Sequence, residues 1–256
     1  MERKILKKKP LVEAIFELKW QLQDLNTGGK IDPHYKLLVG RLYDRCIKQY
    51  PFHEQLPTAS MPDEMLENVV QHRFRTGENN WPLIQIGPGI YAVNDTKNYV
   101  WEDFEKRVVK GVNTLFESYP DSKNLKITNL MLRYIDAIEF DFEKEDIFEF
   151  LKKQMKIEVT MPTQLFEDTE VEKKPLTFNW VFSFPCVKPK AIVTLRFGRG
   201  KKEDAEALIW ETIVQSQSND IPKLPSELKA WLNNAHNITD DWFFKIIQGD
   251  LLKRFE

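Results

Sequence analysis

The sequence predicts an α+β protein in which two similar β-α-β-β-β-α halves, residues 1–120 and 121–256, form antiparallel sheet with helices on one face. Strict alternation of apolar and polar residues marks the strands, and apolar residues at four-residue spacing mark the helices. The same order of elements occurs twice along the chain. A length of 256 residues suits one compact unit made from both halves.

The first half is expected to start with a strand at Leu11–Gln21, where apolar and polar side chains alternate. Asp32 is the predicted N-cap of a helix that runs to about Tyr50, and a second helix is predicted at Tyr99–Ser118. A loop is expected at Pro51–Pro62. Three short strands should follow it, at Val69–Arg75, Pro82–Ile86 and Ile90–Val93.

The second half repeats this order. A long strand is predicted at Leu130–Phe142 and a short helix at Asp146–Met155. The C-terminal helix should start at Ser226 and run to Phe255, with an interruption near His236–Thr239. The three strands between these helices are predicted at Thr177–Phe184, Lys190–Phe197 and Ala207–Gln215.

The element order is similar to that of saddle-shaped sheets of the TATA-binding-protein type and of helix-grip folds. An antiparallel sheet that is covered by helices on one side leaves its other face open to solvent, a ligand or a partner. Gly198–Lys202 is expected to form a basic hairpin turn in this arrangement.

Four short stretches carry a resemblance that spans most of the chain. They are Pro10–Glu17, Gly87–Asp95 with Trp101 and Phe104 after it, Arg133–Glu139, and the pair Ala235 and His236. Together they resemble a sporadically distributed prokaryotic family of uncharacterised proteins of about this length. The resemblance implies one complete folding unit and brings no catalytic residue with it.

Composition and charge exclude several classes of protein. Apolar residues make up 42% of the chain, and 37 basic residues face 39 acidic ones. This balance argues against a nucleic-acid binder, which normally has a basic excess. Two lone cysteines and the lack of a long apolar segment predict a cytoplasmic protein with no membrane association.

Motifs for metals and cofactors are missing from the sequence. The four histidines show no metal-ligand spacing, and Gly87–Gly89 lacks the Lys-Ser/Thr pair of a phosphate-binding loop. His236 and Asp240 are interpreted as a pair in a helix-cap region. Cys186 lies at a hairpin tip with no histidine nearby in the sequence. We therefore expect no cofactor and no metal.

The candidate ligand-binding residues lie on the predicted strands. A polar groove on the open sheet face could use arginines to hold an anionic group and carboxylates to orient it. Cross-strand ion pairs on a wet surface are the alternative interpretation. The candidates are Arg133, Arg196, Glu139, Glu211, Asn179 and, on the opposite parity of its strand, Asp136.

Asp136 differs from the other candidates because it shares its strand face with Leu132, Tyr134, Ile138 and Phe140. If that face meets the core, the carboxyl group is buried and must be paired or protonated. A strand end, a bulge or a structural hydrogen bond would also explain it.

Three functions remain open. The favoured one is a non-catalytic binding or regulatory protein that uses the open sheet face, with a homodimer or protein partner on that face or at a sheet edge. The second is an enzyme for an anionic substrate with Glu139, Asp136 or Glu211 as acid or base. The third, nucleic-acid binding, depends on a local patch of Lys7–Lys9, Arg73, Arg75 and Arg133.

Overall fold

The computed structural model describes residues 6–26, 28–62, 65–96 and 98–256 and is built on one nine-stranded antiparallel sheet. Its strands follow the order β4-β5-β6-β7-β1-β8-β11-β10-β9. The α+β class and the large antiparallel sheet are therefore confirmed. In that order the strands are Phe52–Gln55, His72–Arg75, Leu83–Gly87, Ile90–Asp95, Leu11–Trp20, Ile127–Glu139, Ala205–Gln217, Ala191–Lys202 and Asn179–Cys186. A separate two-stranded ribbon pairs β2 (Gln23–Asp24) with β3 (Lys30–Ile31).

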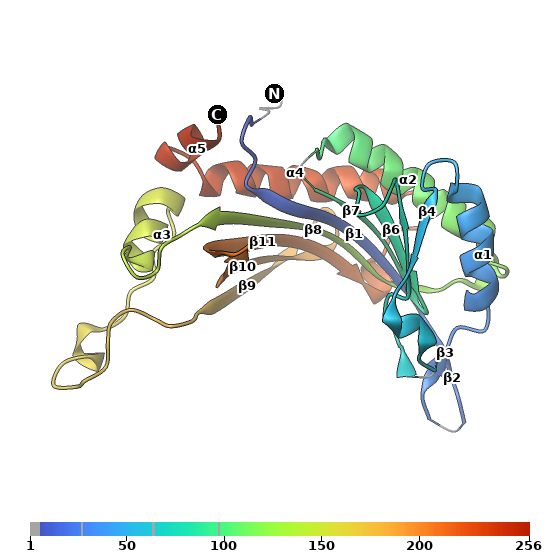
Figure 1. Cartoon of the computed structure of the whole chain (residues 1–256), viewed down its shortest axis with the longest axis horizontal. Helices are drawn as coiled ribbons and strands as arrows, with labels where there is room; N and C mark the ends of the chain where they lie inside the picture. The colour runs from blue at the N-terminus through green and yellow to red at the C-terminus, as the bar shows by residue number, and fades with distance from the viewer. Residues whose placement is uncertain (1–5, 27, 63–64, 97) are drawn as a thin grey trace.

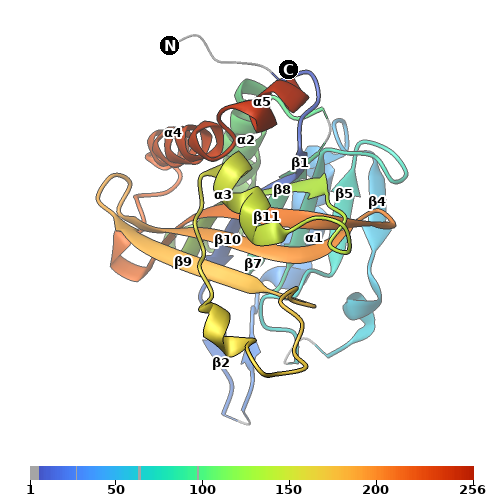
Figure 2. The ribbon, with the colours of Figure 1, turned by 90° about the vertical axis from the view of Figure 1, so that its left-hand side faces the viewer.

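The helices cover the outer side of an arched sheet (Figure 1). The longest, α4, lies along the top of the arch beside α2, and the view from the end shows both above the strands (Figure 2). Across the described residues, no helix is both long and apolar enough to cross a bilayer. The helices are α1 (Tyr35–Cys46), α2 (Trp101–Ser118), α3 (Ile147–Met155), α4 (Leu228–Ile246) and α5 (Asp250–Phe255). Single 3-10 turns lie at Pro57–Ser60, Ser122–Asn124, Thr163–Leu165 and Ser218–Asp220.

The first strand of each predicted half lies at the centre of the sheet. β1 and β8 pair antiparallel with Phe16 opposite Leu132 and Leu18 opposite Leu130. All four of these side chains are buried beneath the helices. The alternation that predicted these strands is the pattern of a sheet with one covered face and one open face.

The core beneath the helices consists of two hydrophobic clusters. The larger cluster joins α1, α2 and the first half of α4 to the centre of the sheet. The smaller cluster joins α3, α5 and the second half of α4 to the far ends of β8, β10 and β11. Buried polar residues lie between the two, in neither cluster: Asp136 on β8, Thr212 on β11, and His236 and Thr239 on α4.

Helix α1 starts later than predicted. Asp32 does not cap it, and the helix begins at Tyr35 after an uncapped His34. The Asp32 carboxylate accepts hydrogen bonds from the His34 backbone N–H at 2.9 Å, from Trp20 Nε1 at 2.8 Å and from the Tyr119 hydroxyl at 2.9 Å. It therefore ties β1 to the end of α2, which local sequence could not indicate.

The predicted interruption of the C-terminal helix near His236–Thr239 is wrong. Helix α4 is continuous there. The Thr239 hydroxyl donates to the His236 carbonyl at 2.9 Å, and both side chains are buried. These two polar side chains lie in the protein interior and do not cap a helix end. The helix instead ends near Gly249, whose φ of 97° suits glycine.

Two hairpins also differ from the prediction. Phe52–Gln55, expected in a loop, forms edge strand β4, where Glu54 accepts a hydrogen bond from Arg75 Nε at 2.7 Å. Gly198–Lys202, expected as a turn, continues β10 and pairs with β11. In both cases pairing with a neighbouring strand gives an extended conformation that the local sequence did not predict.

Candidate functional site

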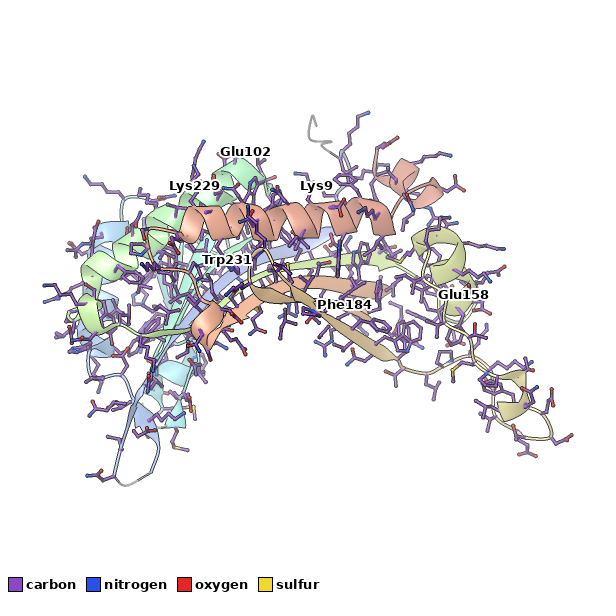
Figure 3. The ribbon with its side chains drawn as sticks, turned by 180° about the vertical axis from the view of Figure 1, so that it is seen from behind. Lys9, Glu102, Glu158, Phe184, Lys229 and Trp231 are labelled. Carbon is purple, nitrogen blue, oxygen red and sulfur yellow. The ribbon has the colours of Figure 1, made fainter. Side chains whose placement is uncertain are left out.

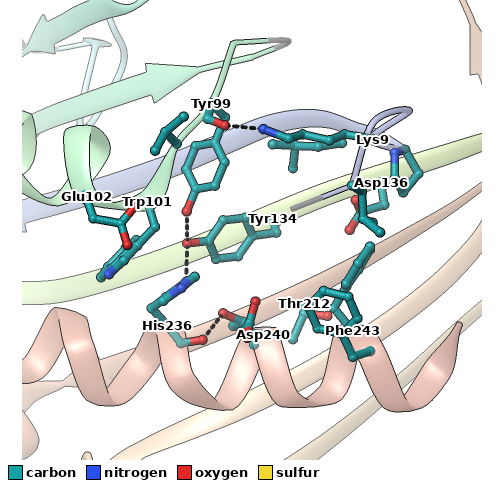
Figure 4. A pocket seen from close by; sticks show the side chains of 16 residues that line it. Lys9, Tyr99, Trp101, Glu102, Tyr134, Asp136, Thr212, His236, Asp240 and Phe243 are labelled. Atoms are coloured by element: carbon teal, nitrogen blue, oxygen red, sulfur yellow. Dashed lines mark hydrogen bonds between the residues drawn. The ribbon is translucent and has the colours of Figure 1, made fainter. Parts of the chain in front are cut away.

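A pocket of about 210 Å³ opens between α4 and the sheet. The segment before β1 and the start of α2 form its other walls (Figure 4). It lies where the polar layer separates the two hydrophobic clusters. Its lining residues are Leu6, Lys9, Pro10, Leu11, Tyr99, Val100, Trp101, Glu102, Tyr134, Asp136, Thr212, His236, Thr239, Asp240, Phe243 and Phe244.

Asp136 is the most unusual residue of the pocket. Strand β8 places it opposite Leu11 of β1 and Trp210 of β11, and its side chain is only 4% exposed. Its carboxyl group has no hydrogen bond or ion pair within the described part of the chain. Burial raises the pKa of Asp136 to about 8, because a low-dielectric site disfavours the charged form.

A series of hydrogen-bonded rings forms one wall of the pocket. The Tyr99 and Tyr134 hydroxyls lie 2.7 Å apart, and the Tyr134 hydroxyl lies 3.0 Å from His236 Nδ1 (Figure 4). The imidazole of His236 also stacks on Trp101 with ring centroids 3.8 Å apart and planes 9° apart. These contacts hold the aromatic wall in one position, since each ring is fixed by a neighbour.

Three charged residues accompany Asp136 around the pocket. The Lys9 ammonium donates to the Tyr99 carbonyl oxygen at 2.6 Å. Glu102 lies in the first turn of α2, and Asp240 lies on α4 one turn after His236. The pocket lining therefore contains three carboxyl groups and one ammonium group.

Helix α4 turns its apolar side toward the pocket and the core. Trp231 points from the helix to the sheet, whereas Lys229 points away from it (Figure 3). The indole Nε1 of Trp231 donates to the Ser216 hydroxyl at 2.9 Å, which holds the start of α4 against β11. This bond attaches α4, on one side of the pocket, to the sheet on the other side.

Four of the predicted candidates meet on the open face of the sheet. Arg133 Nη2 lies 2.8 Å from Glu211 Oε1, and Arg196 Nη1 lies 4.0 Å from Glu211 Oε2. The Arg196 Nε–H donates to Asn179 Oδ1 at 3.0 Å. Two buried atoms, Glu211 Oε2 and Arg133 Nε, have no hydrogen-bond partner among the described residues.

The rest of the open face is linked by hydrogen bonds from strand to strand. Asn94 donates to Glu13 at 2.8 Å, Gln85 donates to Asn94 at 3.0 Å, and Arg73 donates to Gln85 at 2.9 Å. Arg73 and Arg75 both lie against Glu54. These polar groups therefore satisfy one another.

The other two predicted candidates are not part of the Arg133 cluster. Glu139 is exposed at the end of β8, six positions and about 20 Å beyond Arg133. Asp136 lies on the opposite, helix-covered face. The structure therefore does not bring the proposed anion-holding arginines and all three proposed acid/base carboxylates into one site.

The basic patch suggested for nucleic acid is also divided. Lys9 lines the pocket on the helix side, whereas Arg73, Arg75 and Arg133 lie on the open face with carboxylate partners. No group of three or more potential metal ligands occurs within the described residues.

Most pocket residues were not singled out as candidates, although several lie in the stretches quoted for the family resemblance. Pro10 and Leu11 come from the first stretch, Trp101 follows the second, and Tyr134 and Asp136 belong to the third. His236, interpreted as a cap residue, comes from the fourth. The convergence of four separate stretches on one place was the available signal.

Comparison with known proteins leaves the chain without a match. No family model, curated protein or solved structure matches it.

Proposed function

We propose that the protein is a non-catalytic binding protein that holds a small, largely apolar molecule in the pocket beneath α4. The observation that carries this proposal is Asp136, a carboxyl group that is 4% exposed, lines the pocket and has no partner in the described chain. Buried polar groups in native proteins are nearly always hydrogen-bonded. A ligand would supply the missing partner.

The size and lining of the pocket support a small ligand. An engineered apolar cavity of about 150 Å³ binds benzene, so a pocket of about 210 Å³ suits a molecule somewhat larger than benzene. Aromatic and aliphatic side chains surround a few convergent polar groups, which is the usual composition of a ligand site.

Binding is favoured over catalysis by the positions of the reactive groups. The enzyme alternative needs an anionic substrate and an acid or base in the same site. Lys9 is the pocket's only lysine or arginine in the described lining, and it faces three carboxyl groups. Glu139 and Glu211, the other proposed acids or bases, lie outside the pocket.

The test is native mass spectrometry of the purified protein with one variant for each face of the sheet. Thr212→Phe places a ring in the pocket, and Arg133→Ala with Arg196→Ala alters only the open face. We expect a co-purifying small molecule on the wild type and on the double variant, and none on Thr212→Phe. Retention of the molecule by a folded Thr212→Phe protein would contradict the proposal.

Partner binding through the open face is a second candidate. It is favoured by the unsatisfied Glu211 Oε2 and Arg133 Nε and by two exposed apolar side chains on the neighbouring strands β9 and β10, Val181 at 53% and Ile192 at 50%. Under this alternative, Arg133→Ala with Arg196→Ala would remove a co-purifying protein or anionic ligand and leave the pocket ligand in place. The same double variant thus separates the two candidates.

We also propose the relation between the two halves. The order β1-β7-β6-β5 in one half and β8-β11-β10-β9 in the other supports two related units joined at β1 and β8 in a saddle-like sheet. Superposing the first unit on the second tests this relation. Membership of the resembled family, a cytoplasmic location and exclusion of nucleic acid stay predictions.

A further inference from the structure

We infer that the ligand of this pocket is a small organic amine whose protonated nitrogen pairs with the carboxylate of Asp136. The inference rests on the proposed function and names the chemical class of the ligand. Asp136 provides the anchor because it is buried, lines the pocket and has no partner among the described side chains.

The charges that face Asp136 across the pocket favour a cation. The segment before β1 contributes Lys9, whose ammonium is held by the Tyr99 carbonyl oxygen at 2.6 Å. The start of α2 contributes Glu102, and α4 contributes His236 and Asp240. Once Asp136 is ionised, the lining contains three carboxyl groups and one ammonium group, so it suits a ligand that brings a positive charge better than one that brings a negative charge.

The walls of the pocket also suit an organic cation. The lining contains five aromatic residues and the imidazole of His236; the five are Tyr99, Trp101, Tyr134, Phe243 and Phe244. Ammonium groups are attracted to the faces of aromatic rings, most strongly where water is excluded. The rest of a small amine would contact the apolar side chains of Leu6, Pro10 and Leu11.

An ion pair between the ligand ammonium and the Asp136 carboxylate would make the binding affinity depend on pH. Burial raises the pKa of Asp136 to about 8, so below that pH the carboxyl group must lose its proton when the ammonium binds. The affinity should then rise about tenfold for each pH unit between 6 and 8. It should level off above pH 8 until the amine loses its own proton. The other titratable groups that face Asp136 are Lys9, Tyr99, Glu102, Tyr134, His236 and Asp240.

The experiment uses three aromatic probes of similar size and different charge: benzylamine, benzyl alcohol and benzoate. Calorimetric titration of the whole protein at pH 6, 7, 8 and 9 gives the affinity, and buffers of different ionisation enthalpy give the protons released. We expect benzylammonium to bind at least about tenfold more tightly than either analogue, because hydrogen bonds to charged groups are the stronger ones. Binding at pH 7 should release close to one proton.

Variants assign the effect to Asp136. Asp136→Asn should lose at least about tenfold in affinity for benzylammonium and little for benzyl alcohol. Lys9→Met should bind benzylammonium at least as tightly as wild type, because a competing positive charge is removed. Arg133→Ala with Arg196→Ala, on the open face, should bind as wild type does. If Asp136→Asn does not fold, the pH series on the wild type still tests the ion pair between Asp136 and the ligand ammonium.

Failure of this inference can be told apart from failure of the proposed function. Equal or tighter binding of benzyl alcohol or benzoate, lost in Thr212→Phe, would overturn the amine and keep the pocket as the binding site. Weaker benzylammonium binding to Lys9→Met, or binding that does not change between pH 6 and 8, would also overturn the amine. If none of the probes binds and no molecule co-purifies, both proposals fail.

Discussion

Several charged residues on the open face of the sheet have partners of opposite charge, whereas Asp136 on the covered face has none among the described residues. Strand β8 carries an example of each within three positions. Arg133 points to the open face and finds Glu211 at 2.8 Å across the neighbouring strand. Asp136 points to the helices and has no partner in the described chain. An open face can pair its charges across strands at low cost. On the covered face, burial disfavours the charged form of a lone carboxyl group and raises its pKa.

The largest expected effect is the pH dependence of stability caused by Asp136. Its pKa is about 8 in the folded protein and 3.8 as the ordinary value, so between these values the folded state binds more protons than the unfolded state. The free energy of unfolding should therefore fall by about 1.4 kcal/mol for each pH unit, about 4 kcal/mol from pH 5 to 8, and then level off. Urea unfolding at each pH measures it.

Asp136→Asn should remove this pH dependence, because an amide does not titrate. Asp240→Asn, at the same pocket but half-buried, serves as the matched control and should keep the slope of the wild type. Parallel stability curves for wild type and Asp136→Asn would mean that the carboxyl group is ionised at neutral pH without cost.

The next effect concerns Trp101, which is 5% exposed and stacks on His236. Trp101→Ala should lower the free energy of unfolding by about 3–5 kcal/mol, since it removes a large buried side chain. Val181→Ala on the open face, where the side chain is 53% exposed, should change it by about 0.5 kcal/mol or less. Similar losses of unfolding free energy for the two variants would contradict the conclusion that the covered face carries the packing and the open face does not.

A smaller effect is expected for the ion pair of the open face. Arg133→Ala leaves Glu211, which is 8% exposed, without its closest positive charge. The loss should be about 1–3 kcal/mol, as for a buried group left without its hydrogen bond. Adding Glu211→Gln should recover part of it, and a double-mutant cycle measures how much. An Arg133→Ala protein as stable as wild type would show that solvent already screens the pair.

The smallest effect is expected for Arg196. Its Nη1 lies 4.0 Å from Glu211 and its side chain is 44% exposed, so Arg196→Ala should cost about 0–1 kcal/mol and less at high salt. Thermal unfolding at low and high salt compares the two conditions. A loss larger than that of Arg133→Ala would reverse the assignment of the main partner of Glu211.

The sequence predicted the parts of the fold that depend on local periodicity. Alternation along β8 correctly put Asp136 on the same strand face as Leu132 and Tyr134, a face that the structure shows to be buried, and four-residue spacing identified α2. Edge strand β4 and the late start of α1 were missed because pairing with β5 and the contacts of Asp32 come from distant segments. The pocket was missed for the same reason, because its walls come from segments that are far apart in the sequence.

The candidate site illustrates this limit most clearly. Arg133, Arg196, Glu211 and Asn179 were correctly grouped because strand parity places them on one face. Tyr134 and His236 are 102 positions apart, and nothing in either segment indicates their hydrogen bond. Strand parity also could not show that the partnerless Asp136, rather than the paired arginines, lines a pocket.

The polar layer that separates the two hydrophobic clusters has a consequence for local unfolding. Regions with few apolar contacts between them can open as separate cooperative units. The cluster of α3, α5 and the far ends of β8, β10 and β11 meets the main cluster across Asp136, Thr212, His236 and Thr239. Amide hydrogen exchange should therefore be faster in α5 than in α2, and a molecule held at this boundary should slow the exchange of both.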